Sequence, residues 1–152
     1  MLASQLGRRT PVTRNLERQA IQLAHRLEDP YVLAFVDLQR GIAALHVGEW
    51  ATSLDLLLAS EKRLVDECQG VSWELVRSRE SILYSLVEQG RLDELDNRIH
   101  TYLRAAELRT DPFAQGTLQR RPTPVWLAPA AAEGERAPLA GVTAPRHDRS
   151  TT

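Results

Sequence analysis

The sequence has 152 residues, enough for one domain with a hydrophobic core but too short for two domains of ordinary size. Its 19 basic and 20 acidic residues nearly cancel, which argues against an overall field that would attract nucleic acid or an anionic membrane. The single Cys68 cannot form an internal disulfide, and no apolar stretch approaches the roughly 20 residues of a membrane span, so we expect a cytoplasmic protein.

The first predicted helix covers residues 14–28. Its apolar side chains recur every three or four residues and form one stripe, which includes Leu16, Ala20, Leu23 and Leu27. The helix stops at Asp29-Pro30, where Asp29 can accept hydrogen bonds from the first free amides of the next helix and Pro30 needs no N–H donor.

The second predicted helix, residues 31–47, is apolar around most of its circumference and should therefore be buried on several sides. Gly41 would let another backbone approach closely, and Gly48 should end the helix in the left-handed conformation. The third, residues 50–68, has an apolar face and an acidic face, so we expect an outer, half-exposed helix. We place on its apolar face Trp50, Leu54, Leu57, Leu58, Leu64, Val65 and Cys68, and opposite it Asp55, Glu61, Lys62 and Asp66.

Two more helices are predicted at residues 73–89, with Ser72 as the capping residue, and at residues 92–108. A last helix begins at Pro112 and has little support beyond Gln119. Five of the eight prolines and seven alanines lie in the final 33 residues, without a sustained period. We therefore expect a helical domain over residues 1–119 and a disordered tail over residues 120–152.

An internal repeat connects these elements. Turn glycines 41 and 42 residues apart occur at Gly7, Gly48 and Gly90, and helix-opening aromatic residues occur at Tyr31, Trp73 and Phe113. A period of this size is typical of stacked helical hairpins, in which no unit can bury its apolar face without a neighbour. The sequence thus predicts an all-α chain of antiparallel hairpins stacked as a short solenoid, with a binding or scaffolding surface.

With an inner helix, a Gly-Glu-Trp turn and an outer helix, residues 30–110 resemble tetratricopeptide repeats. Gly41 and Trp50 match the family's tight-packing glycine and outer-helix aromatic, whereas Leu83 and Leu92 depart from them in the second unit. A narrower resemblance is to the helical-repeat region that follows the catalytic domain in large bacterial serine/threonine protein kinases. It rests on Asp29-Pro30-Tyr31, Gly48-Glu49-Trp50, the segment from Cys68 to Leu75, Gln89-Gly90-Arg91 and Asp111-Pro112-Phe113-Ala114.

The resemblance implies a non-catalytic interaction or regulatory module of a signalling protein. It carries over no catalytic residue, because the chain has no glycine-rich phosphate loop, no His-Arg-Asp loop and no Asp-Phe-Gly site. Only six residues precede Gly7, so from the repeat we expect the inner helix that should pair with residues 14–28 to be missing. We therefore expect the stripe of that helix to drive self-association or docking onto upstream repeats, either as the C-terminal piece of a longer protein or by completing the stack with another chain.

The candidate partner-binding residues lie where inner helices would line a concave face: Phe35, Leu38, His46, Arg77, Glu80, Tyr84 and Glu88. The polar run Arg77 to Ser81 is either a solvated face or part of a groove for a peptide with acidic groups. The partner is then a protein or peptide, and no enzyme activity, cofactor or metal is predicted.

Other chemistry has weak support. Asp93, Asp96 and His100 share a helix face, but a solvated acidic turn explains them better than a metal site or a metal-dependent hydrolase does. His25 and His46 are more typical of surface residues than of catalytic bases, and Cys68 is more typical of a core than of a nucleophile. The basic residues Arg8, Arg9, Arg14 and Arg18 lack the interleaved aromatics of a nucleic-acid site. The alternative is that the chain belongs to a protein kinase whose catalytic domain lies on another segment or chain.

Overall fold

The computed structural model describes residues 10–120, which contain six α-helices and no strand. The helices are α1 (Pro11–Leu27), α2 (Pro30–His46), α3 (Trp50–Glu67), α4 (Ser72–Glu88), α5 (Leu92–Leu108) and α6 (Pro112–Arg120). The chain divides into units of residues 1–122 and 123–152, and these helices belong to the first. The all-α class is confirmed over this range, whereas the predicted tail and the turn at Gly7 lie outside the described residues.

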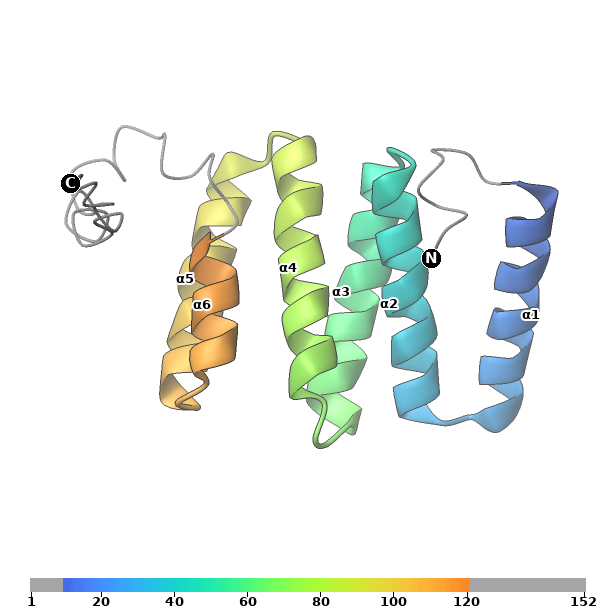
Figure 1. The fold of residues 1–152 in the computed structure, drawn as a ribbon, viewed down its shortest axis with the longest axis horizontal. Coiled ribbons are helices and arrows are strands. Elements are labelled where there is room, and N and C mark those ends of the chain that lie inside the picture. Colours follow the sequence, from blue (N-terminus) through green and yellow to red (C-terminus); the bar gives the residue numbers. More distant parts are fainter. Residues whose placement is uncertain (1–9, 121–152) are drawn as a thin grey trace, which may run out of the picture. The chain divides into compact units, whose positions relative to one another are not determined.

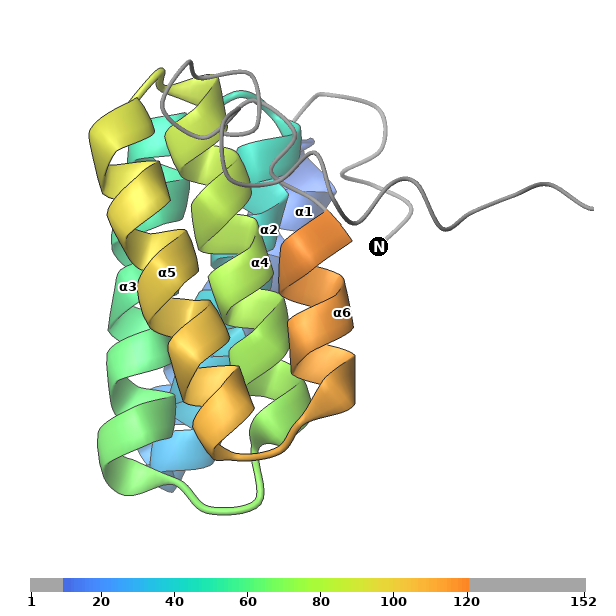
Figure 2. The same ribbon diagram turned by 90° about the vertical axis from the view of Figure 1, so that its left-hand side faces the viewer.

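Consecutive helices reverse direction and lie side by side (Figure 1). In the view from the α5 end, α3 and α5 form one layer and α2 and α4 form a second (Figure 2). The largest interface joins α2 to α3, and α6 packs against both α4 and α5. Among the described helices, α1 contacts α2 alone. One end of the row is therefore a helix that is covered on one side only.

Most helix ends follow the signals in the sequence, with two exceptions. The predicted start of the first helix at residue 14 is wrong, because α1 begins at Pro11 and Thr10 caps it by accepting a hydrogen bond from the Thr13 amide at 3.2 Å. Asp29 Oδ1 accepts hydrogen bonds from the Tyr31 amide at 2.8 Å and the Val32 amide at 3.2 Å, and Gly48 has a φ of 81°. The prediction that Ser72 caps α4 is wrong, because Ser72 is its first helical residue. Val71 precedes the helix instead, and its carbonyl accepts a bond from the Leu75 amide at 3.0 Å without any side-chain cap.

Four fully buried serines form a seam between α2, α3 and α4. The Ser53 hydroxyl donates to the Gly41 carbonyl at 2.8 Å and lies 2.8 Å from the Ser85 hydroxyl. Ser60 donates to the Ala34 carbonyl at 2.8 Å, and Ser78 donates to a carbonyl of α3 at 3.1 Å. Each hydroxyl is therefore paired inside the core, where an unpaired hydroxyl would cost free energy.

Gly41 provides the close approach that the sequence predicts. A Cβ added at this position would lie 2.6 Å from Leu57 Cγ, 2.8 Å from Leu57 Cδ2 and 3.3 Å from the Leu57 backbone nitrogen. Leu57 is completely buried, so its side chain has little room to move. The absence of a side chain at Gly41 therefore sets the distance between α2 and α3.

Candidate functional site

A hollow of about 540 Å³ lies between α2, α4 and the start of α3. It is lined by Ile42, Leu45, His46, Gly48, Trp50, Arg77, Ser81, Tyr84 and Glu88. Its position follows from the turn after α2, where Gly48 ends one helix and Trp50 begins the next. Residues from the end of α2 and the middle and end of α4 thus meet over one concave surface.

The hollow has a floor of apolar side chains together with the buried Ser81, and a polar rim. Ile42 is buried, Leu45 is half-buried, and the Trp50 side chain is 39% exposed. On the rim, His46 and Glu88 are exposed. His46 contributes an imidazole and Glu88 contributes a carboxylate. A surface of this kind can accept an apolar side chain and fix its orientation through a few polar contacts.

Four of the seven predicted partner-binding residues line this hollow: His46, Arg77, Tyr84 and Glu88. The other three do not. Phe35 is half-buried and stacks on Tyr31 with a ring-centroid distance of 6.1 Å. Leu38 is 0% exposed and Glu80 is 4% exposed, so in this conformation neither offers a surface for direct contact with a partner.

The sequence reasoning did not select Ile42, Leu45, Trp50 or Ser81 as lining residues. In a helix that is apolar on nearly all sides, the hydrophobic pattern does not show which side chains reach a concave surface. The turn glycine at Gly48 was the available signal, since it places Trp50 beside the end of α2.

The polar run from Arg77 to Ser81 is not a solvated face. Ser78 is fully buried and donates to the Leu57 carbonyl, and Ser81 is 4% exposed and donates to the Arg77 carbonyl at 2.9 Å. Glu80 is buried and forms an ion pair with Arg77. Arg77 and Ser81 line the hollow, whereas Arg79 points to α3, so the run serves both the core and the site.

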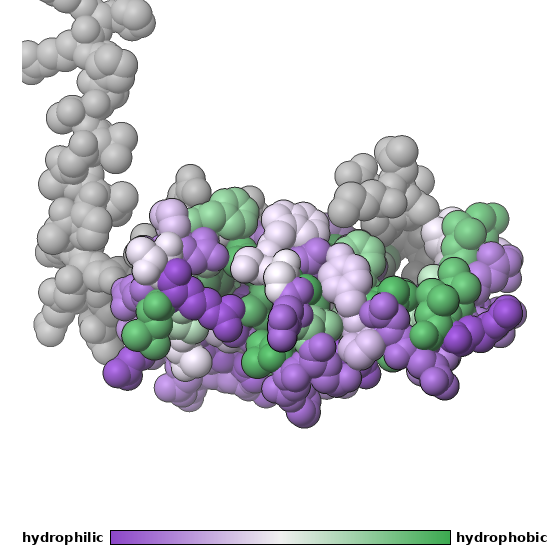
Figure 3. Space-filling model, turned by 90° about the horizontal axis from the view of Figure 1, so that it is seen from below, coloured by the Kyte–Doolittle hydropathy of each residue, from purple (hydrophilic) through white to green (hydrophobic). Residues whose placement is uncertain are grey.

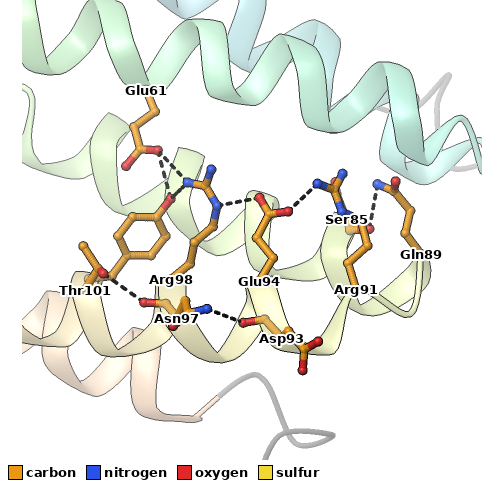
Figure 4. A network of polar contacts seen from close by, with 10 residues as sticks. Glu61, Ser85, Gln89, Arg91, Asp93, Glu94, Asn97, Arg98 and Thr101 are labelled. Atoms are coloured by element: carbon orange, nitrogen blue, oxygen red, sulfur yellow. Dashed lines mark hydrogen bonds and ion pairs between the residues drawn. The ribbon is translucent and has the colours of Figure 1, made fainter.

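On the α3 and α5 side of the molecule, Glu61 organises a polar network (Figure 4). Glu61 Oε1 accepts from Arg79 Nε at 2.8 Å, and Oε2 accepts from the Tyr102 hydroxyl at 2.9 Å. Arg98 donates to the Tyr102 hydroxyl at 3.0 Å and to Glu94 at 3.0 Å. The prediction that Glu61 faces solvent opposite the apolar face is wrong, because α4 and α5 pack over it and provide its partners.

The network also affects the titration of its phenol. Burial and the charge of Glu61 raise the pKa of Tyr102, so this hydroxyl keeps its proton to a higher pH than an ordinary tyrosine does. The Arg79 guanidinium lies 4.7 Å from the centre of the Tyr102 ring. These side chains are hydrogen-bond partners of one another and connect α3, α4 and α5. This arrangement is typical of a network that stabilises the fold.

Two side chains considered for chemistry have ordinary structural surroundings. Burial, with the charges of Glu67 and Asp29, raises the pKa of the half-buried Cys68 thiol, which disfavours the nucleophilic thiolate. His100 Nε2 lies 3.5 Å from Asp96 Oδ1 on an exposed helix face. Within residues 10–120 there is no group of three or more His, Cys, Asp or Glu side chains that could hold a metal ion.

The predicted apolar stripe of α1 is exposed. The exposed fractions are 58% for Leu16, 55% for Leu23 and 56% for Leu27, and Ala20 is also exposed. Hydrophobic side chains gather at the α1 end of the molecule in the space-filling view (Figure 3).

The comparisons with known proteins identify no relative. No protein-family model, no curated protein and no solved structure matches the chain. Within the described part of the chain, every helix is too short or too polar to cross a membrane.

Proposed function

We propose that the chain is a non-catalytic helical-repeat module that binds a segment of another protein in the hollow between α2 and α4. The observation that carries this proposal is that the apolar side chains Ile42, Leu45 and Trp50 line the same hollow as the polar residues His46, Arg77 and Glu88. In this proposal α2 with α3 and α4 with α5 are two tetratricopeptide-like units. The turns at Gly48 and Gly90, 42 residues apart and both in the left-handed conformation, support that assignment.

The chemistry of the rim favours a ligand with an acidic group next to an apolar side chain. Arg77 forms an ion pair with Glu80, but a guanidinium has five N–H donors and can bind a second carboxylate at the same time. Ile42 and Trp50 offer apolar contact beside it. An extended or helical peptide with one acidic and one large apolar residue fits this arrangement.

On the sequence resemblance alone, we further propose that the module regulates a kinase-type signalling protein. In the proteins that the sequence resembles, the helical-repeat region follows the catalytic domain, and we propose the same position for this module. In this proposal no residue of the described helices takes part in phosphoryl transfer. Finding a kinase-coding reading frame directly upstream supports the alternative that the chain belongs to such an enzyme. A gene neighbourhood without one removes this second proposal and leaves the first intact.

Selection from a displayed library of random 12-residue peptides tests the hollow directly. Peptides selected on the full chain are expected to carry Asp or Glu near a large apolar residue, and to bind with Kd values of about 1–100 μM. His46→Ala and Tyr84→Ala should each weaken binding at least about tenfold, a change of about 1.4 kcal/mol.

His25→Ala is the matched control, because His25 is an exposed histidine on α1 that does not line the hollow. It should leave the affinity unchanged. Selected peptides that bind the His46 and Tyr84 variants as tightly as the original chain would place the binding surface elsewhere and refute the proposal.

A further inference from the structure

One face of α4 lines the hollow from the middle of the helix to its end. Arg77, Ser81, Tyr84 and Glu88 recur every three or four residues, and all four lie on the wall of the hollow. Arg77 and Glu88 have opposite charges and lie at the two ends of this row. Their Cα atoms are three turns of helix, or about 16 Å, apart along the axis. The hollow therefore has a basic end and an acidic end.

The two charged groups differ in what already binds them. The Arg77 guanidinium forms an ion pair with the buried carboxylate of Glu80. Glu88 is exposed, and its carboxylate has no hydrogen bond or ion pair with any other residue between 10 and 120. A cationic group of a ligand can therefore bind Glu88 without displacing a side chain of the described helices.

The acidic end of the hollow has a fixed position. Gln89, the residue after Glu88, donates from Nε2 to the Trp50 carbonyl at 3.1 Å and to the Ser85 carbonyl at 3.0 Å (Figure 4). These bonds join the end of α4 to the start of α3. The helices α2 and α4 run in the same direction, so His46 at the end of α2 lies at this end of the molecule too (Figure 1). The backbone that carries Glu88 is thus held in place beside the hollow.

We propose that the hollow binds an extended peptide segment with an acidic residue at Arg77, a basic residue at Glu88 and apolar residues between them. The inference rests on the proposed function and adds to it a second charge and a spacing. Ile42 and Leu45 of α2 provide apolar contacts beside the row. A Lys or Arg side chain is the group of a peptide that complements the carboxylate of Glu88.

The size of the hollow favours an extended ligand over a helix. An α-helix with its side chains is about 10–12 Å across, so about one turn of it fills 540 Å³, whereas Arg77 and Glu88 are three turns apart. The Arg77 guanidinium reaches Glu80, one turn nearer to Glu88, which brings the distance between the two charges to about 11–16 Å. An extended chain rises about 3.3 Å per residue, so the charged residues of the ligand are about three to five positions apart.

Peptides selected on the full chain from the random 12-residue library test this spacing. They should carry a basic residue about three to five positions from the acidic residue, with an apolar residue between them. Glu88→Lys should weaken their binding at least about tenfold. Glu107→Lys is the matched control, because Glu107 is an exposed glutamate near the end of α5 that does not line the hollow. It makes the same change in net charge and should alter the Kd by less than about twofold.

A charge-reversed peptide shows whether Glu88 acts through a charge pair. Exchanging the basic residue of a selected peptide for Glu should restore its affinity for the Glu88→Lys chain to within about threefold of the original pair. Because Glu88 is exposed, the circular dichroism spectrum of the variant should match that of the original chain. If Glu88→Lys does not fold, Glu88→Gln removes the charge at nearly constant size and should still weaken binding.

The outcomes separate this inference from the proposed function. Peptides that lose affinity with Tyr84→Ala but bind the Glu88→Lys chain as tightly as the original chain overturn the inference and leave the proposed function intact. Equal losses with Glu88→Lys and Glu107→Lys, or no recovery with the charge-reversed peptide, also overturn the inference alone. Peptides that bind the His46→Ala and Tyr84→Ala chains as tightly as the original chain refute the proposed function, and the inference with it.

Discussion

Gly41→Ala tests how closely α2 and α3 are packed. The new methyl carbon would lie 2.6 Å from Leu57 Cγ and 2.8 Å from Leu57 Cδ2, well inside van der Waals contact. Overpacking of this kind costs about 1–3 kcal/mol, while exchanging Gly for Ala in a helix interior contributes about 1 kcal/mol in the opposite direction. Because Leu57 is fully buried and has little room to shift, the overpacking cost should lie at the upper end of this range, at about 2–3 kcal/mol, which leaves a net loss of about 1–2 kcal/mol of unfolding free energy.

The assay is urea unfolding followed by circular dichroism at 222 nm, and two further variants separate the terms. Ala43→Gly measures the helix-propensity term in α2, at about 1 kcal/mol. Leu57→Ala removes the clashing atoms and costs about 2–5 kcal/mol by itself, but in that background Gly41→Ala should become neutral or stabilising. If Gly41→Ala leaves stability unchanged or raises it in the original chain, the packing argument is refuted.

Two further predictions concern the network around Glu61. Glu61→Gln leaves Arg79 and Arg98 without their shared countercharge and should lower the unfolding free energy by about 1–3 kcal/mol. Glu67→Gln is the control, because the Glu67 carboxylate is half-exposed and lies 4.0 Å from Arg63. It should change the unfolding free energy by less than about 0.5 kcal/mol. Equal effects of the two variants in urea unfolding would contradict this. Tyr102 has a folded-state pKa above its ordinary value of about 10, so its stabilisation is fully present below pH 10 and is lost as the pH rises toward the folded-state pKa, by up to about 1.4 kcal/mol per pH unit. Tyr102→Phe should remove this loss. The unfolding free energy of the original chain should therefore exceed that of the variant by a margin that shrinks between pH 9 and pH 11. A margin that stays constant over this range would show that Tyr102 does not titrate differently on folding.

The helices and their ends could be predicted because their signals are local. The Asp29-Pro30 pair and the turn glycines Gly48 and Gly90 each act within a few residues, and the structure confirms them. The direction of Glu61 could not be predicted, since periodicity assigns a residue to a face but does not say which later helix will cover that face. Glu61 meets Tyr102, a residue 41 positions away, only after α5 has packed.

The same reasoning explains which site residues were found. Tyr84 and Arg77 stand out in a helix that is otherwise expected to be buried, so the pattern selects them correctly as lining residues. Glu80 belongs to the same run but points inward, because a helix turns by about 100° per residue and neighbours in sequence face different ways. The burial of the serines could not be predicted, since serine is more often exposed than buried.

The serine seam has a consequence for how the hollow would meet a ligand. Through its single hydroxyl, Ser53 contacts both Gly41 of α2 and Ser85 of α4, and these two helices provide most of the walls of the hollow. Sliding one helix along the other would break these contacts and leave hydroxyls buried without partners. The serine seam therefore prevents α2 and α4 from sliding along their axes, and the walls of the hollow are already in place before a ligand binds. A peptide that binds there would not have to supply the free energy for arranging them.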